Sequence, residues 1–421
     1  MQYLDSKKCS NIYNDPMSQY MIWKNILKIK DFQNLSYSTF SHWLGFGMEH
    51  VALGWLIVEI TDSSFMVGVA MAIRMVPLFV FGVFSGFFAD NFDRRIMLRF
   101  VTLISAFIPV FLGVLLIFEA INIFFILVFY MFSGTAFAFV LTLRQTYIYD
   151  VVGENGVVTG LSLLQIFSQF GGIFGSLISG WLIQEFSVGI QYIVIGVCYL
   201  GSFLLLLNVN KTGQFRGDKS ESFKSSVTNY FKLLKNHSIL ITLMILVSMS
   251  EIFGFTHMTL IPVFSKDVLN LGAFGLGVLT SIRQLGGFTG LIALTVFDSY
   301  KSKGLLVLII TVIFGLTQIT AYFATSFIAF GIILFLINAC AMSADTLFKS
   351  LMQISVPNKD RGTAMGSWVL SIGTAPLGHL GLGAIGNIWG SPFGFLFNGI
   401  ILFSTGVVSI VTLKKVRMMK L

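Results

Sequence analysis

The sequence contains few charged residues. Asp, Glu, Lys and Arg make up 11% of its 421 residues, whereas a soluble domain carries about 25% to keep its surface hydrated. Apolar residues make up 55% of the chain, and 44 residues are Phe. This balance excludes a soluble enzyme, a disordered protein and a nucleic-acid-binding protein. It predicts a chain whose partner is the lipid bilayer.

Cysteine and the common catalytic motifs are also scarce. Three Cys are present, too few for a disulfide framework. Neither a His-Glu-x-x-His metal motif nor a Gly-x4-Gly-Lys-Ser/Thr phosphate loop occurs in the sequence. No Ser or Cys stands in a motif with a base that would activate it. The sequence therefore predicts a protein that is not an enzyme, binds no metal or cofactor and does not use ATP on its own.

Twelve long apolar runs are bounded by charges, Pro or Gly. One helical crossing of a bilayer takes about 20 residues, and runs of this length are too long for the strands of a membrane barrel. They predict an all-α membrane protein with twelve transmembrane helices. The expected helices cover residues 35–59, 65–89, 96–118, 121–149, 157–185, 189–207, 239–264, 274–297, 305–324, 327–348, 363–385 and 393–413.

Lys and Arg are concentrated in the two tails and in every second connection between the apolar runs. With the N-terminus in the cytoplasm, all of them fall on the cytoplasmic side except Lys266, Arg74 and Arg283. Basic residues are retained on that side during insertion. The distribution predicts a multi-pass protein of the cell (cytoplasmic or inner) membrane with both termini in the cytoplasm. It also explains the net charge of +8 without an anionic partner.

The second half of the chain repeats features of the first. Gly68-Val69 and Arg74 match Gly277-Val278 and Arg283, and the four-residue spacing of small side chains in the fifth run recurs in the eleventh. The spaced residues are Ser168, Gly172, Ser176 and Gly180, then Ser371, Ala375, His379 and Gly383. Such a repeat predicts two six-helix bundles, residues 1–210 and 238–421, with a substrate site near the midplane between them. The cytoplasmic connecting segment, 211–237, is expected to be an amphipathic surface helix or a partly ordered linker.

A motif after the second run resembles a known family. The motif is Gly82-x-x-x-Gly86-x-x-x-Asp90-x-x-Asp93-Arg94-Arg95, and it resembles the loop signature between helices 2 and 3 of the major facilitator superfamily. Other segments resemble the branch of that family with the enterobactin exporter and macrolide-efflux permeases. These segments are Val51-Ala52-Leu53-Gly54-Trp55-Leu56, Leu143-Arg144-Gln145 ahead of Asp150, and Val356-Pro357 ahead of Arg361-Gly362. The resemblance implies two pseudo-symmetric six-helix bundles. The chain departs from the branch at Phe46, where members often carry an acid, and its own acid, Glu49, comes one helical turn later.

The resemblance also implies that the loop latches the outward-facing state. Glycines permit close helix contact, and Asp90 can accept hydrogen bonds from the amides at a neighbouring helix N-terminus. Arg94 and Arg95 can pair with an acid such as Asp150. The alternative is that the two arginines only determine topology. The expected latch comprises Gly82, Gly86, Asp90, Asp93, Arg94, Arg95 and Asp150.

Ionisable side chains deep in the predicted helices are the strongest clue to mechanism, because each is costly in hydrocarbon. They are Glu49, Arg74, Glu251, Arg283 and Asp345. Glu49 matches Glu251 and Arg74 matches Arg283, which predicts one Glu–Arg pair in each half. Such a pair is either a structural bridge or a device in which the acid exchanges its arginine for a proton. Asp345 is either a second proton site or an anchor near Lys349.

Aromatic and amide side chains in the same runs are candidate contacts with a substrate. They are Trp43, Trp55, Gln165, Gln284 and Asn338, although the two Trp could instead belong to an interfacial aromatic belt. The charges and the resemblance together predict a monomeric secondary transporter that exports a small organic molecule, siderophore-like or drug-like, by proton antiport. The alternatives are a facilitator or importer of a small solute without proton coupling, and a non-transporting membrane scaffold or receptor.

Overall fold

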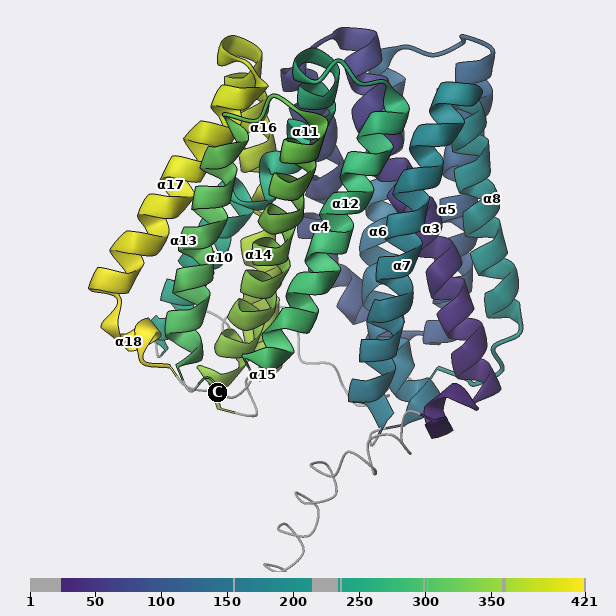
Figure 1. The fold of residues 1–421 in the computed structure, drawn as a ribbon. Coiled ribbons are helices and arrows are strands. Elements are labelled where there is room, and N and C mark those ends of the chain that lie inside the picture. Colours follow the sequence, from purple (N-terminus) through teal and green to yellow (C-terminus); the bar gives the residue numbers. More distant parts are fainter. Residues whose placement is uncertain are drawn as a thin grey trace, which may run out of the picture.

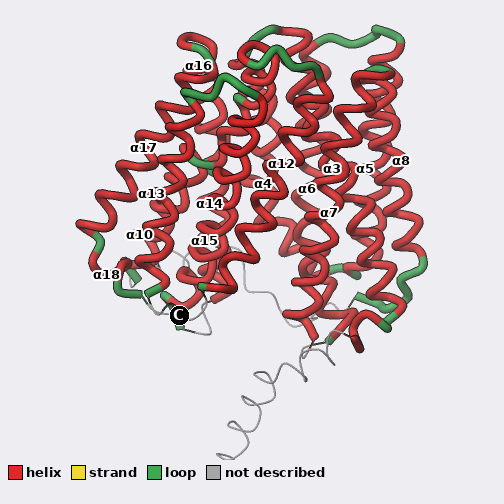
Figure 2. Tube along the Cα trace, viewed as in Figure 1, coloured by secondary structure: helices red, strands yellow, loops and turns green. Residues whose placement is uncertain are grey.

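The protein, seen here in a computed structural model, is built from long helices that run roughly side by side (Figures 1 and 2). The structure describes residues 24–153, 156–213, 234, 237–297, 300, 302–357 and 361–419, without the side chains of residues 82–91, 158 and 361–363. No β-strand occurs among these residues. Eleven of the described helical stretches are long and apolar enough to cross a membrane. The predicted all-α membrane fold is therefore confirmed.

The first six helices agree closely with the apolar runs. They are α3 (Lys30–Thr61), α4 (Ser64–Asn91), α5 (Arg94–Ile117), α6 (Ile123–Val152), α7 (Val157–Glu185) and α8 (Val188–Leu207). Side chains that accept hydrogen bonds from the first free amides begin three of them: Asp93 begins α5, Asn122 begins α6 and Ser187 begins α8. The largest difference is at α3, which begins at Lys30 rather than at residue 35 because polar residues extend the helix beyond its apolar part.

The seventh span is not the single helix predicted over residues 239–264. It consists of α10 (Ser238–Phe253), the 3-10 helix η2 (Phe255–Thr259), α11 (Ile261–Val263) and the π-helix η3 (Phe264–Val268). The α-helical hydrogen bonds stop at Gly254. Gln318 then donates from Nε2 to the carbonyls of Phe253, at 3.1 Å, and Gly254, at 3.4 Å. A broken backbone is tolerated at membrane depth because another helix satisfies its polar groups.

The eleventh span is also interrupted. It consists of α15 (Arg361–Ile372) and α16 (Ala375–Trp389), whereas the apolar pattern predicts one helix over 363–385. Pro376 stands in the first turn of α16. Proline has no amide hydrogen to donate, which does no harm in the first turn of a helix. In the middle of one continuous helix the same proline would remove a backbone hydrogen bond. The remaining helices are α12 (Ala273–Val296), α13 (Lys303–Ala321), α14 (Phe327–Ile354), α17 (Ser391–Thr412) and the short α18 (Lys414–Arg417).

Among the described residues, the buried apolar clusters that combine the two sets of helices lie toward one face of the molecule. We call the face at which α3 begins and α17 ends the terminal face (bottom of Figure 1), and the other the opposite face. Near the terminal face, each of the two buried apolar clusters contains described residues of one half. Near the opposite face the clusters combine both halves: Val263 joins a cluster of the first half, and Val51 and Ile183 join a cluster of the second.

Small residues form the contacts between the halves at the opposite face. A Cβ on Gly383 of α16 would lie 2.8 Å from the Ser64 carbonyl oxygen and 3.1 Å from the Gly68 Cα of α4. A Cβ on Gly180 of α7 would lie 3.0 Å from the Gly277 Cα of α12. Helices can approach this closely only where side chains are small. The two contacts use matching positions of the sequence repeat, so the pseudo-symmetry of the sequence is also present in the packing.

The loops of the opposite face add polar contacts between the halves. Lys266 Nζ lies 2.8 Å from Asp62 Oδ1, and Ser63 Oγ donates to Asn387 Oδ1 at 2.9 Å. Asp62 has a left-handed backbone, with φ of 49°, and ends α3. The opposite face is therefore closed by helix packing, an ion pair and a hydrogen bond.

Candidate functional site

A cavity of about 560 Å³ lies between the two halves, toward the terminal face. Its walls come from α3, α6 and α7 in the first half and from α14 and α15 in the second. The lining residues are Thr39, His42, Trp43, Phe137, Val140, Leu141, Arg144, Gln145, Thr146, Leu161, Leu164, Gln165, Ser168, Lys349, Gln353, Met365 and Trp368. This volume is typical of sites for small organic molecules.

Of the five candidate substrate contacts, Trp43 and Gln165 line this cavity. The other three lie elsewhere. Trp55 packs against an apolar cluster of the second half. Gln284 of α12 donates to the Gly172 carbonyl at 3.0 Å and to Ser176 Oγ at 2.5 Å, and Asn338 accepts a hydrogen bond from Arg283. Gln284 therefore joins α12 to α7, and Asn338 holds an arginine inside the second half.

Glu49 lies at the centre of a buried polar cluster in the first half. Its carboxylate accepts hydrogen bonds from Ser133 Oγ and from Tyr199 OH, the latter at 2.7 Å. Arg74 Nη2 is 3.5 Å from its Oε2, and both side chains are 5% exposed. The cluster thus draws on four helices, α3, α4, α6 and α8. Two hydroxyl groups therefore donate hydrogen bonds to the carboxylate, and Arg74 forms an ion pair with it.

Aromatic rings border the Glu49 cluster on the side of the cavity. The Arg74 guanidinium carbon lies 4.8 Å from the centre of the Phe46 ring and 5.9 Å from that of Phe137, distances that permit cation–π attraction. Phe137 and His42 line both the cavity and the small pocket of about 10 Å³ that contains Glu49. The two sites are therefore neighbours, separated by single side chains.

The second half does not contain the equivalent Glu–Arg pair. Arg283 Nη1 donates to Asn338 Oδ1 at 3.0 Å, and the described residues show no ion pair between Arg283 and Glu251. Glu251 is buried in α10. Asp345 itself is 2.8 Å from Lys349 Nζ and accepts a hydrogen bond from Trp368 Nε1 at 2.9 Å. The structure therefore places Asp345 where an anchor for Lys349 would be.

Charged residues of the loop motif form contacts within the first half of the molecule. Arg94 Nη1 lies 3.1 Å from Asp150 Oδ2, so this pair joins the start of α5 to the end of α6. Asp93 caps α5 by accepting from the Arg95 amide at 2.8 Å, and it also accepts from the Gly213 amide at 3.2 Å. Gly82 and Gly86 lie in α4, and the side chain of Asp90 lies outside the described residues.

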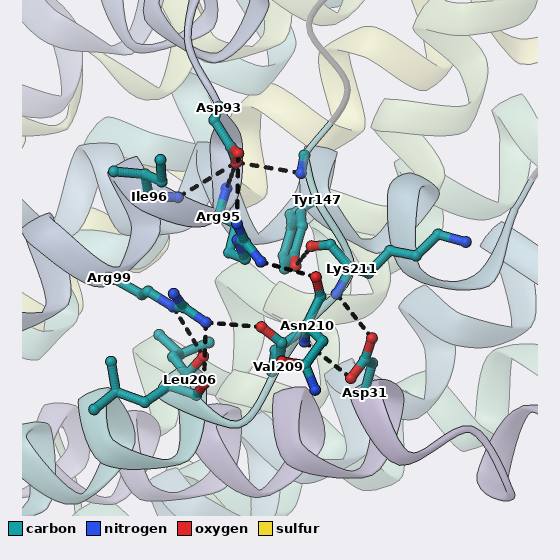
Figure 3. Close-up of polar contacts among 12 residues, drawn as sticks. Asp31, Asp93, Arg95, Ile96, Arg99, Tyr147, Leu206, Val209, Asn210 and Lys211 are labelled. Atoms are coloured by element: carbon teal, nitrogen blue, oxygen red, sulfur yellow. Dashed lines mark hydrogen bonds and ion pairs between the residues drawn. The ribbon is translucent and has the colours of Figure 1, made fainter.

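Arg95 of the motif, together with Arg99 and Asp31, fastens the chain that follows α8 (Figure 3). Arg95 donates to the Asn210 carbonyl at 2.8 Å and Arg99 to the Val209 carbonyl at 2.8 Å, while Asp31 accepts from the Lys211 amide at 2.9 Å. These bonds hold the first residues of the connecting segment against the first half. The surface helix predicted in that segment falls on residues 214–233, which lie outside the described residues.

Arg144 is the buried basic residue among the cavity-lining residues that the sequence did not predict. It falls near the end of the fourth apolar run, where it counts as one more basic residue of the cytoplasmic side. In the structure it is 5% exposed and donates to Thr39 Oγ1 at 2.7 Å and to Ser202 Oγ at 2.9 Å. Its position could have indicated that it is buried. The helix continues beyond it to Asp150 and Val152, so Arg144 lies more than one turn inside the span.

Comparisons with known proteins agree with this architecture. The model of the Major Facilitator Superfamily matches residues 35–377. The staphyloferrin A transporter of Staphylococcus aureus is 24% identical over 367 residues, 86% of this chain and 91% of the relative. An uncharacterized transporter of Buchnera aphidicola subsp. Schizaphis graminum is 24% identical over 332 residues, 74% of this chain and 76% of the relative.

Solved structures share the fold at low sequence identity. The nucleoside transporter NupG superposes with a TM-score of 0.72 at 14% identity, over 91% of this chain and 99% of that one. A D-xylose-proton symporter superposes with a TM-score of 0.69 at 13% identity, over 94% and 99%. Since the family model covers most of the sequence and the fold agrees, the chain belongs to the Major Facilitator Superfamily.

Proposed function

We propose that this transporter exports a small organic molecule, siderophore-like or drug-like, in exchange for protons. The observation that carries the proposal is the buried Glu49 carboxylate beside the cavity, held by Ser133, Tyr199 and Arg74. In the proposed cycle, α3 moves against α4 and the Glu49 carboxylate exchanges its arginine partner for a proton.

In the proposed cycle, residues 1–210 rock as one body against residues 238–421. The closed opposite face and the cavity toward the terminal face represent one end state. With the terminal face in the cytoplasm, as the basic residues predict, this state takes up its solute from the cytoplasm. The cycle needs no cofactor and no chemical change in the solute, and one chain contains both halves, so a monomer suffices.

The loop motif has a place in the same cycle. Closure of the cavity would bring the terminal ends of the two halves together and let Asp90 meet a helix end of the second half. Arg94 and Asp150 keep the loop in position within the first half. Glu251 is the second candidate for proton uptake, because it is a buried acid inside a membrane-spanning helix of the second half. The relative named for staphyloferrin A supports a small organic solute.

Efflux measured with and without a proton gradient tests the proposal. Compounds that disappear from the medium when the gene is deleted identify a solute, and its efflux is then followed in cells before and after a protonophore. We expect the protonophore and Glu49→Gln each to abolish uphill efflux at normal membrane expression. Glu59→Gln is the matched control, because Glu59 lies on the same helix and is exposed.

The alternative is a facilitator in which Glu49 and Arg74 form a structural bridge. It predicts downhill flux that continues after the protonophore and in Glu49→Gln. That result would remove proton antiport from the proposal.

A further inference from the structure

The Arg144 guanidinium is a buried positive charge whose described partners are neutral. Thr39 and Ser38 of α3 and Ser202 of α8 accept its hydrogen bonds at 2.7, 3.2 and 2.9 Å. No carboxylate pairs with it among the residues that the structure describes, and its Nε is buried without a hydrogen bond. Hydroxyl groups orient a guanidinium but do not neutralise it, and an uncompensated charge at membrane depth is costly. Within the described part of the chain, Arg144 therefore has no negatively charged partner.

The cavity has room for that partner. Arg144 lines the space of about 560 Å³ between the halves. Arg283 also lacks a carboxylate, but the pocket it lines has a volume of about 10 Å³, which holds at most one water molecule. The two arginines thus differ in what can reach them, and Arg144 is the one that a solute can contact.

A second basic group lines the same cavity from the other half. Lys349 of α14 lies 2.8 Å from Asp345 and 3.8 Å from the centre of the Trp368 ring. Asp345 balances the charge of Lys349 and does not itself line the cavity, so Arg144 leaves the walls with a positive excess. Each half therefore presents one basic side chain to the space between them.

The remaining walls are suited to an organic body rather than to a bare ion. Trp43, Phe137 and Trp368 supply aromatic faces, and Gln145, Gln165 and Gln353 supply amide donors and acceptors. Planar guanidinium groups bind carboxylates through two parallel hydrogen bonds. Aromatic walls favour a solute with a flat or apolar part.

We propose that the cavity binds an organic carboxylate, with Arg144 and Lys349 as its charge partners from the two halves. This inference rests on the proposed function in one respect, that the cavity is the site of the transported solute. A carboxylate held between the halves would neutralise Arg144 and draw α6 and α14 together, which favours closure of the terminal face around the solute.

Binding to the full chain in lipid nanodiscs tests the inference with two probes of matched size. Isophthalate has one aromatic ring and two carboxylates, and isophthalamide is its neutral counterpart. We expect isophthalate to bind the wild type at least about tenfold more tightly than isophthalamide, and Arg144→Gln to remove that preference. Arg99→Gln is the matched control, because Arg99 belongs to the same half and donates to the carbonyls of Leu206, Leu207 and Val209 outside the cavity.

A variant that keeps the charge protects the test against misfolding. Arg144→Lys is expected to fold and to retain a preference for isophthalate. The inference is overturned if isophthalate fails to bind the wild type, if isophthalamide binds as tightly, or if Arg144→Gln keeps the preference. Binding is measured without a gradient, so its outcome is separate from proton coupling. A preference for isophthalate that depends on Arg144 supports the inference even if Glu49→Gln exports normally. If efflux is coupled to protons but no such preference is found, the proposed function stands and the carboxylate inference is rejected.

Discussion

The first half of the molecule pairs its deep acid with its deep arginine, and the second half separates them. Glu49 and Arg74 share one buried cluster, whereas Arg283 is hydrogen-bonded to the neutral amide of Asn338. Glu251 is buried in α10, and the described residues show no ion pair between it and Arg283. Matching positions in a repeat therefore give matching helices without giving the same electrostatics. The difference concentrates the acid–arginine coupling in the first half.

The backbone shows a second difference between the halves. Spans one and five are the unbroken helices α3 and α7, while their counterparts, spans seven and eleven, are interrupted near Gly254 and Gly373. Thr259 Oγ1 and His379 Nδ1, one from each interrupted span, are 2.7 Å apart. The second half therefore contains two broken spans joined by a side-chain hydrogen bond, where the first half has continuous helices.

The largest effect that would test this comparison is expected from removing the two arginines in turn. Arg74→Gln leaves Glu49 as a buried charge without its ion partner and should lower the free energy of unfolding by about 3–5 kcal/mol. Arg283→Gln removes a hydrogen bond to a neutral amide and should cost about 1 kcal/mol. Unfolding by a denaturing detergent, followed by Trp fluorescence, measures both.

The double variant Glu49→Gln/Arg74→Gln provides the control for that experiment. It removes both charges, so it should recover most of the stability that Arg74→Gln loses. Equal losses in the two single variants would show that the halves treat their arginines alike and would contradict the comparison.

An intermediate effect is expected where the two halves touch. Gly383→Val places a side chain against Ser64 and Gly68 and should weaken the contact by up to about 3 kcal/mol. Spin labels at Ser63 and Asn387, which are hydrogen-bonded in the structure, should then report a longer distance. Gly381→Val is the matched control, since nothing lies within 4 Å of a Cβ at Gly381. A label distance that stays short in Gly383→Val would contradict the assignment of this contact.

The smallest effect is expected at the ion pair of the opposite face. The Lys266 and Asp62 side chains are 38% and 78% exposed, so Lys266→Gln should change the free energy of unfolding by about 0.5 kcal/mol or less. Screening at about 1 M salt should remove that difference. Asp62→Asn in the Lys266→Gln background should add nothing. A loss well above that size would mean that the pair, rather than the glycine packing, holds the halves together.

Much of this architecture could be predicted from local features of the sequence. Apolar runs bounded by charges located the spans to within a few residues, and matching glycines predicted the repeat that the contacts of Gly68 and Gly277 display. The interruption of the seventh span could not be predicted in the same way. Gly254 and Pro262 are visible in the sequence, but the group that makes the break tolerable is Gln318, which lies two helices further along the chain.

The residues of the candidate site also differ in whether the local sequence identifies them. Glu49 and Arg74 stand out because charged residues are rare inside apolar runs, so composition alone was enough to find them. Arg144 does not stand out in the same way, because it lies close to the cytoplasmic end of its predicted run, where a basic residue is expected. Its role depends on which way its side chain points around α6 and on the hydroxyls of α3 and α8 that meet it.

The sequence by itself determined that the chain is an all-α, multi-pass membrane protein and that its two halves are related, because these features follow from patterns in short segments. The tertiary structure alone decided that the halves meet at the opposite face, that Arg283 is bonded to Asn338 rather than to Glu251, and that Arg144 borders a cavity with Lys349. These features arise from contacts between helices that are distant in the chain. Such contacts depend on side-chain direction and helix packing, which no single segment contains.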